Sequence, residues 1–287
     1  MTRILVHVHL YYFDMWPELK QAVQNITAPY DLFVTVTEHN ADIEKDILAF
    51  NSEARIILVE NKGFDVWPFI KVLNDVDLND YDYIVKLHSK RDMPIGTLRN
   101  GFDVSRDMWR KYLYAFLSNT TNFEKCLKAF EADKTLGMIS DYRMIVKNEK
   151  KYPELVKKVT VTLNSLGFKA NKHSSYVMGT MFMVQAKLFE PLKRLQLTEK
   201  NFTTSKHSGK DELPYVFELL FGYLTEAQSY QIKDVLTSPT KQIYGKIFSI
   251  LKNFLWRKKV TSSGKIVCKF CKIPVFVSKN KGGNNVV

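Results

Sequence analysis

Apolar residues follow two different periods in the first 90 residues of the chain. Short apolar runs, typical of buried strands, are separated by stretches of about ten residues in which apolar side chains recur at helical spacing. The predicted strands are residues 3–10, 31–37, 54–60 and 81–88, and the predicted helices are residues 16–26, 41–50 and 66–75. Strands that alternate with helices form βαβ units, so the pattern predicts a mainly parallel sheet with helices on both faces.

The carboxyl ends of the predicted strands are the places to look for a binding site, because open α/β sheets bind their ligands there. The loops in question follow Leu10, Thr37, Glu60 and Leu87. Any cluster of polar side chains in these four loops is therefore a candidate site.

The chain from residue 100 to residue 234 continues with both kinds of element. The predicted helices are residues 107–117, 122–133, 152–167 and 211–227, and the predicted strands are residues 135–141 and 174–184. Gly179 lies inside the second of these strands, where a glycine often marks the close approach of a backbone or a ligand. Asp211 stands at the N-cap position of the last helix.

Charge is distributed unevenly along the chain. The formal net charge is +12, from 42 Lys and Arg against 30 Asp and Glu. Residues 235–287 contain eleven Lys or Arg and no acid, which leaves 31 bases and 30 acids in residues 1–234. A nearly neutral main part argues against a nucleic-acid partner, which requires positive charge over a groove-sized face. We therefore predict one domain over residues 1–234 and a basic tail over residues 235–287.

The basic tail begins with a predicted amphipathic helix. Its apolar face holds Ile243, Ile247, Ile250, Leu251 and Phe254, and its polar face holds Lys246, Ser249, Lys252 and Asn253. A basic amphipathic helix followed by Trp256 and "RKK" fits the surface of an anionic membrane. Each Lys or Arg near such a surface contributes about 1 kcal/mol to the free energy of binding. A helix docked on the rest of the chain, with a solvated basic face, explains the same pattern equally well.

The compartment follows from what the sequence lacks. No apolar run approaches the roughly 18 residues that a membrane span needs, and the first residues alternate like a strand instead of forming a signal peptide. We expect a cytoplasmic protein that the tail holds at the inner face of the cell membrane. Cys126, Cys268 and Cys271 are too few for a disulfide framework. Cys268 and Cys271 form a CxxC without a second ligand pair nearby, so structural thiols are favoured over zinc or redox chemistry.

Five segments within residues 1–234 stand out as an ordered set. They are "HVHLYYFDMWPELKQAVQNITAPYDLFVTV", "ENKGFDVWPFI", "YDYIVKLHSK", "MGTMFMVQAKLFEPL" and "KDELPYVFELLFGYL". In this order they resemble the blocks of the rhamnan synthesis protein F family, over roughly residues 3–234. Proteins of that family are regarded as glycosyltransferases of bacterial cell-wall, capsular and O-antigen polysaccharide assembly. The blocks are also similar in layout to glycosyltransferases of the GT-A fold, so the resemblance implies a GT-A-like (Rossmann-like) α/β domain.

The resemblance implies a nucleotide-sugar donor and a glycan or lipid-linked acceptor as partners. The family's namesakes are taken to transfer rhamnose from a dTDP-linked donor, so rhamnose is one candidate sugar. The expected reaction is a single displacement that inverts the anomeric carbon. The alternative is a non-catalytic binding or scaffold subunit of a polysaccharide assembly complex that keeps the fold.

For the base and ribose of the donor, the resemblance points to the ends of the first three strands. The residues are His7, His9 and Tyr11, then Thr37 and Glu38, then Asn61, Gly63 and Asp65. Gly63 permits a turn that residues with a Cβ resist, and Asp65 can accept hydrogen bonds from ribose or sugar hydroxyls. The alternative is an ordinary strand-to-helix turn in which Asp65 caps the next helix. Phe64 stands where the family leads us to expect an arginine, which argues against a phosphate contact there.

For the departing diphosphate, which needs positive charge, the candidates follow the fourth strand. They are His88, Ser89, Lys90 and Arg91. GT-A enzymes commonly place Asp-x-Asp here to hold Mn²⁺ or Mg²⁺, whereas these side chains offer donors and charge without a metal. Asp92 is the single acid in that loop and alone makes a poor magnesium site. We therefore expect no cofactor and favour a metal-independent mechanism over one with Mn²⁺ or Mg²⁺. The alternative is that Lys90 and Arg91 are simply solvated.

For the base that takes the acceptor's proton, the resemblance points to Asp211. An acid near a helix start, after the glycine-bearing strand, lies below the acceptor hydroxyl in inverting GT-A enzymes. His207 in the preceding loop is the alternate base, because an imidazole with a near-neutral pKa can do the same work. Gly179, Thr180 and Glu212 are expected on the acceptor or sugar side. The alternative for Asp211 is an N-cap that needs no substrate.

Overall fold

The structure is a computed structural model that describes residues 2–98, 101–147, 152–171, 173–203, 213–260, 265–270 and 273–279. The chain forms two compact units. The body unit contains residues 1–91 and 110–236, and the tail unit contains residues 92–109 and 237–287. The basic tail therefore shares its unit with residues 92–109, a segment that the charge pattern did not single out.

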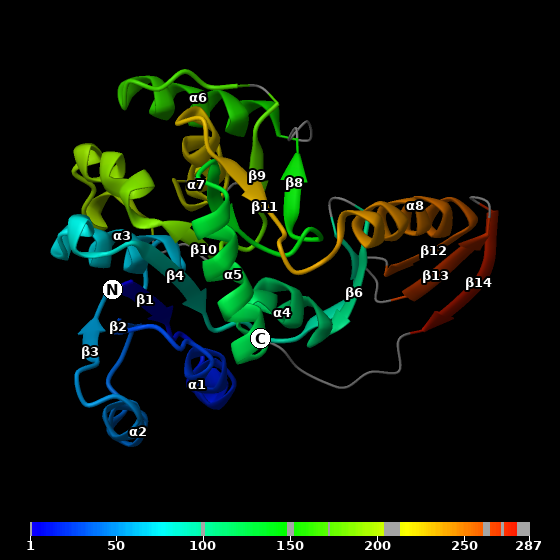
Figure 1. The fold of residues 1–287 in the computed structure, drawn as a ribbon. Helices are drawn as coiled ribbons and strands as arrows, with labels where there is room; N and C mark the ends of the chain where they lie inside the picture. Colours follow the sequence, from blue (N-terminus) through cyan, green and yellow to red (C-terminus); the bar gives the residue numbers. More distant parts are fainter. Residues whose placement is uncertain are drawn as a thin grey trace. The chain divides into compact units, whose positions relative to one another are not determined.

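Seven strands form the sheet of the body unit, in the order β11-β7-β10-β4-β1-β2-β3 (Figure 1). Their bounds are β1 Ile4–His9, β2 Tyr30–Val36, β3 Arg55–Leu58, β4 Tyr83–His88, β7 Leu136–Ile139, β10 Phe182–Gln185 and β11 Gln231–Lys233. Strand β1 is parallel to β2 and β4, β2 is parallel to β3, and β7 is parallel to β11. Strand β10 runs antiparallel between β4 and β7. The predicted α/β class with a mainly parallel sheet is confirmed.

Helices connect the strands of the body unit. Their bounds are α1 Trp16–Gln24, α2 Ala41–Phe50, α3 Val66–Asp75, α5 Thr120–Ala132, α6 Pro153–Ser165 and α7 Leu213–Ala227, and α4 Met108–Leu113 begins in the tail unit and ends in the body unit. Short 3₁₀ segments are Phe13–Met15, Leu78–Asp80, Ala115–Leu117, Ala186–Leu195 and Glu199–Asn201. A small antiparallel pair, β8 Ile145–Lys147 and β9 Ser175–Val177, completes the unit. The prediction of one strand over residues 174–184 is wrong, because a turn separates β9 from β10.

Helices α3 and α5 cover opposite faces of strand β4. The ring of Phe69, on α3, packs near Lys86, whose Nζ lies 5.3 Å from the ring centroid. Tyr83 stacks on Phe130 of α5 with a centroid separation of 4.6 Å. Tyr83 and Lys86 are three residues apart on one strand, so their side chains point to opposite faces. Strand β4 is thus covered on both sides, as expected for the centre of a parallel sheet.

The tail unit holds one long helix and two small sheets. Helix α8 spans Pro239–Leu255, and the strands β12 Trp256–Val260, β13 Lys265–Phe270 and β14 Ile273–Lys279 form an antiparallel sheet in chain order. Strands β5 Met93–Thr97 and β6 Asp103–Arg106 form an antiparallel pair. The part of the chain that the structure describes contains no helix that is long and apolar enough to cross a membrane.

Candidate functional site

Two neighbouring strands carry polar side chains on one face, toward their carboxyl ends. Residues two apart on a strand share a face, and the register pairs His7 with Lys86 and His9 with His88. All four side chains are buried, and Lys86 and His7 have no exposed surface. We call these four residues the His–Lys block. Because β1 and β4 are parallel, the block lies at the edge of the sheet where α/β proteins bind ligands.

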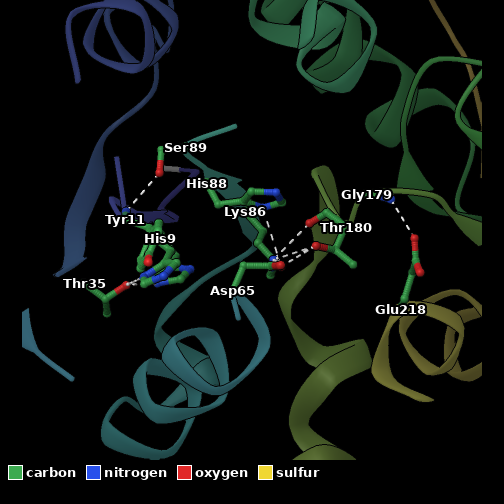
Figure 2. Close-up of polar contacts among 11 residues, drawn as sticks. His9, Tyr11, Thr35, Asp65, Lys86, His88, Ser89, Gly179, Thr180 and Glu218 are labelled. Carbon is green, nitrogen blue, oxygen red and sulfur yellow. Dashed lines mark hydrogen bonds and ion pairs between the residues drawn. The ribbon is translucent and has the colours of Figure 1, made fainter. Parts of the chain in front are cut away.

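Asp65 joins the His–Lys block from the loop before α3 (Figure 2). Its Oδ2 accepts hydrogen bonds from Lys86 Nζ at 2.6 Å and from Thr180 Oγ1 at 2.5 Å, and it lies 3.5 Å from His88 Nδ1. Asp65 stands at the N-cap position of α3, but its side chain makes no capping hydrogen bond. The interpretation of Asp65 as a helix cap is therefore wrong, because its carboxylate is the counterion of a buried lysine.

The turn before Asp65 requires glycine at position 63. Gly63 has a φ of 63°, and Phe64 has a φ of 53°. A Cβ on residue 63 would lie 2.5 Å from the ring of Phe202 and 2.9 Å from the Cβ of Trp67. Gly63 therefore meets both conditions for a glycine, a left-handed backbone and a close neighbour. Gly63, one of the predicted donor-binding residues, thus allows the turn that directs Asp65 toward Lys86.

A second turn brings Thr180 to the same lysine. Gly179 and Thr180 have φ values of 78° and 52°, which is uncommon for a β-branched residue such as threonine. The carbonyl oxygen and Oγ1 of Thr180 accept hydrogen bonds from Lys86 Nζ at 3.1 Å and 3.0 Å. On the other side of the turn, the Gly179 N–H donates to Glu218 Oε1 of α7 at 3.0 Å (Figure 2). Glu218 thus holds the turn that supplies two of the three oxygen partners of Lys86.

The histidines of the block are joined to strand β2. Thr35 Oγ1 lies 2.9 Å from His7 Nε2 and 3.0 Å from His9 Nδ1. Neither ring nitrogen of His88 has a hydrogen-bond partner within the described residues, although His88 is only 4% exposed. A buried polar atom without a partner is uncommon in folded proteins. Both ring nitrogens of His88 are therefore unpartnered among the described residues, and so is Nδ1 of His7.

The charges of the site follow from its burial. Burial lowers the pKa of His9 to about 4 and lowers the pKa of His7 and His88 well below its usual value. Burial alone would raise the pKa of Asp65, but the imidazole of His88, the ammonium of Lys86 and the hydrogen bonds to Oδ2 hold that pKa well below its usual value. Burial lowers the pKa of Lys86, and the carboxylate of Asp65 opposes that change. Near pH 7 the site therefore holds one ion pair among neutral imidazoles.

The loop after β4 is tied to the loop after β1. Ser89 N–H donates to the His9 carbonyl oxygen at 2.8 Å. Ser89 Oγ accepts from the N–H of Tyr11 at 2.9 Å (Figure 2) and from the N–H of Tyr12, also at 2.9 Å. The Arg91 side chain, which is 60% exposed, lies 3.4 Å from Asp14 and over the ring of Tyr12 at 4.4 Å. Lys90, which lies between Ser89 and Arg91 in the sequence, is half-buried. Ser89 thus joins the two loops by hydrogen bonds, whereas the side chain of Arg91 is exposed to solvent.

The sequence model of the rhamnan synthesis protein F family matches residues 1–230 of this chain. The chain belongs to that family. The resemblance read from the five sequence segments is confirmed, and the His–Lys block, Asp65, Thr180 and Glu218 all lie inside the matched residues. The order and directions of the strands give the α/β fold with a mainly parallel sheet that the sequence predicted, and family membership supports a glycosyltransferase role.

Similar proteins include the uncharacterized protein WxcX from two strains of Xanthomonas campestris pv. campestris. Both are 21% identical over 238 residues, which is 80% of this chain and 32% of theirs, so the chain spans about a third of their length. Similar solved structures include S. aureus TarS, with 9% identity, a TM-score of 0.42 and coverage of 77% of this chain and 56% of that chain. Another is glucosyl-3-phosphoglycerate synthase from Mycobacterium tuberculosis in complex with Mn²⁺, UDP and glucosyl-3-phosphoglycerate. It shows 10% identity, a TM-score of 0.35 and coverage of 97% and 90%.

Other predicted residues of this family member lie apart from the His–Lys block. Thr37 and Glu38 form the turn after β2, and Asn61 is exposed at the start of the loop after β3. No hydrogen bond between described residues joins these three to the block. Asp211, His207 and Glu212 lie outside the described residues, so their assigned roles stay predictions. Within the residues searched, no group of three or more His, Cys, Asp or Glu is arranged to hold a metal ion.

The site also contains residues that the sequence reasoning did not assign. Lys86 and Thr35 lie in strands that the sequence predicts as apolar, and Glu218 lies in the helix predicted over residues 211–227. A signal for Lys86 exists in the sequence, because "HVH" in β1 and "KLH" in β4 each place polar residues two apart in otherwise apolar strands. In parallel strands that are buried on both faces, such a pattern indicates a polar surface inside the sheet.

Proposed function

We propose that this protein transfers a sugar from a nucleotide-sugar donor to a growing cell-surface glycan or a lipid-linked glycan. Membership of the rhamnan synthesis protein F family and the GT-A-like fold support glycosyl transfer in general. Rhamnose is the candidate sugar, from the family's name. The observation that carries the proposal is the ionised Asp65 beside the unpartnered His88, at the carboxyl ends of parallel strands.

Asp65 is suited to bind a hydroxyl of the donor. Its three close polar neighbours all approach Oδ2, and no described residue donates a hydrogen bond to Oδ1. The side chain is 18% exposed, so this oxygen can meet a ligand. Because Lys86 keeps the carboxylate charged, Oδ1 is a strong acceptor for a ribose or sugar hydroxyl. His88, beside it, has two buried ring nitrogens without a hydrogen-bond partner among the described residues, and a ligand that reached them would meet one donor and one acceptor.

The diphosphate of the donor would lie beyond this pair, toward the loop after β4. Ser89, Lys90 and Arg91 are the residues proposed to meet it, and their charge would stabilise the departing nucleoside diphosphate without a metal. The acceptor hydroxyl oxygen attacks the anomeric carbon, and the bond to the diphosphate oxygen breaks with its electron pair. Asp211 is proposed to take the hydroxyl proton, with His207 as the alternate base. A single displacement of this kind inverts the anomeric carbon.

A thermal-shift screen of nucleotide sugars tests the proposal directly. A donor that binds only the folded state raises the melting temperature, and at a hundred times its Kd it adds about 2.7 kcal/mol to the free energy of unfolding. We expect Asp65→Asn to abolish the shift measured against the melting temperature of the same variant without ligand. The matched control is Asp75→Asn, because Asp75 lies at the other end of α3 and pairs only with Lys71 in an exposed i,i+4 contact.

Donor hydrolysis or transfer by the purified chain then separates an enzyme from a binding subunit. Full turnover in excess EDTA is expected, and turnover that is lost in EDTA and restored by Mn²⁺ would refute the metal-independent mechanism. A chain that binds a donor without hydrolysing or transferring it is the non-catalytic subunit instead. If no nucleotide sugar shifts the melting temperature, or if Asp65→Asn keeps the shift, the proposed site is wrong.

A further inference from the structure

Helix α8 packs within its unit through its polar side. Ser249 is 6% exposed, and its Oγ donates to the Gly101 carbonyl oxygen at 2.5 Å, inside the tail unit. Gln242 and Gly245 are half-buried, and their spacing of three and four residues places them on the same helical face as Ser249. The side that α8 buries is therefore small and polar, the reverse of an ordinary amphipathic helix on a protein surface.

The opposite side of α8 is apolar and exposed. Seven of its large apolar side chains are between 44% and 69% exposed, and we call them the α8 apolar face: Ile243, Tyr244, Ile247, Phe248, Ile250, Leu251 and Leu255. Only four other large hydrophobic side chains in the described part of the chain are exposed to this extent, and they come from separate segments. A continuous apolar surface of this kind marks a place where another apolar phase or partner binds.

Lysines border the α8 apolar face on both sides. At about 100° per residue, the apolar positions cover an arc of about 160°. On the same basis Lys241 and Lys252 lie beside one edge of that arc, and Lys246 lies beside the other. Long lysine side chains in this position reach past an apolar face while their stems stay against it. The arrangement thus combines an apolar centre with two cationic borders.

We propose that α8 lies on an anionic lipid bilayer, with its apolar face in the interface and its lysines on headgroup phosphates. The charge of the tail favours this occupant, because residues 235–287 contain eleven Lys or Arg and no acid. A second copy of the same basic helix would be repelled, and a nucleic acid offers nothing to cover seven apolar side chains. The helix has 17 residues and includes three lysines, which suits a helix in the interface and not one that spans the bilayer.

Cosedimentation of the full chain with lipid vesicles tests this proposal without any sugar donor. We expect binding to vesicles that contain phosphatidylglycerol, little binding to pure phosphatidylcholine vesicles, and weaker binding at high salt. Ile247→Ser with Leu251→Ser should weaken binding at least about tenfold, since it removes exposed apolar surface at the centre of the face. Replacing Lys241, Lys246 and Lys252 by Gln should weaken it roughly a hundredfold, at about fivefold for each charge.

The control variant is Val161→Ser, which removes an apolar side chain that is 62% exposed on α6 of the body unit. This variant should bind vesicles like the wild type. The proposal is overturned if the wild type does not bind anionic vesicles, or if the double serine variant binds them as well. It is also overturned if the α8 apolar face instead supports dimerisation in sedimentation velocity, or if the lysine variant loses DNA binding without losing vesicle binding. None of these results depends on whether the chain transfers a sugar.

Discussion

Acid should destabilise this protein through His9, in a pH range where ordinary carboxylates are still charged. Burial lowers the pKa of His9 from 6.5 to about 4, while the unfolded chain keeps the ordinary value. Between these pH values the unfolded state binds a proton that the folded state does not, so the free energy of unfolding falls as the pH falls. The stability is fully present above pH 6.5 and is lost progressively toward pH 4.

The size of the loss in the free energy of unfolding follows from the width of that pH range. One pH unit is worth about 1.4 kcal/mol for a single group, so His9 alone removes roughly 3 kcal/mol between pH 6.5 and pH 4. Burial also lowers the pKa of His7 and of His88 well below the usual value, and both act with the same sign. A loss of this size is a large part of the 5–15 kcal/mol that typically separates folded from unfolded domains.

Urea denaturation at about pH 7 and about pH 5 measures the effect. Between these two pH values we expect the free energy of unfolding to fall by about 2 kcal/mol more in the wild type than in His9→Gln. The variant has no imidazole at position 9 to protonate in its unfolded state. His39→Gln is the control, since the His39 side chain is 71% exposed, and it should lose as much as the wild type. If the wild type and His9→Gln lose the same free energy of unfolding, His9 is not held neutral by burial and the reasoning fails.

Three further substitutions test the contacts around the block by urea denaturation. Lys86→Met should lower the free energy of unfolding by about 3 kcal/mol, since it leaves the Asp65 carboxylate without its cation, and adding Asp65→Asn should recover part of that loss. Gly63→Ala should cost more than the roughly 1 kcal/mol expected of Gly167→Ala, because both residues have positive φ but a Cβ meets close neighbours only at Gly63. Glu218→Leu should cost about 1 kcal/mol through the lost hydrogen bond from Gly179, and Glu218→Gln, which keeps an acceptor oxygen, should cost less.

For each of these substitutions, one outcome would refute the reasoning behind it. If Asp65→Asn recovers none of the stability that Lys86→Met removes, the two side chains do not form a coupled pair. Equal losses in the two glycine variants mean that the ring of Phe202 moves aside at little cost. Equal effects of Glu218→Leu and Glu218→Gln mean that the side-chain oxygen does not hold the turn.

The fold was largely predictable from the sequence because the central strands are mostly apolar and are separated by helices. The predicted strands over residues 3–10 and 81–88 contain β1 and β4, and the one over residues 31–37 overlaps β2, which begins one residue earlier. The prediction failed at residues 174–184, where a turn divides the segment. Thr180 adopts a positive φ there, which its own side chain disfavours, and contacts with Lys86 compensate for it. Such a turn depends on tertiary contacts and leaves no local pattern.

The site was predictable in location and less so in composition. The rules for parallel sheets predict a site at the carboxyl ends of the strands, and the structure brings together five of the predicted residues: His7, His9, Asp65, His88 and Thr180. Lys86 was missed, because a single lysine within an apolar strand looks like an exception until its counterion is known. Asp65 lies 21 residues earlier in the chain. Glu218 contacts a residue 39 positions away, and no spacing rule joins a helix side chain to a turn at that distance.

Thr35 lies between two imidazoles, and this position limits which groups donate and which accept hydrogen bonds in the site. Its hydroxyl has one hydrogen, so it can donate to at most one ring and must accept from at least one. His7 Nδ1 is buried with no hydrogen-bond partner among the described residues, and an orphaned N–H is rarer in proteins than an orphaned acceptor. This favours a His7 that carries its hydrogen on Nε2 and donates to Thr35, whose own hydrogen can then go to His9 Nδ1. If Thr35 donates to His9 Nδ1, the hydrogen of His9 lies on Nε2, and an atom that meets His9 there must be an acceptor, such as a carbonyl or phosphate oxygen. With that order of hydrogen bonds, the side chains inside the sheet would set which edge of a ligand the first strand could bind.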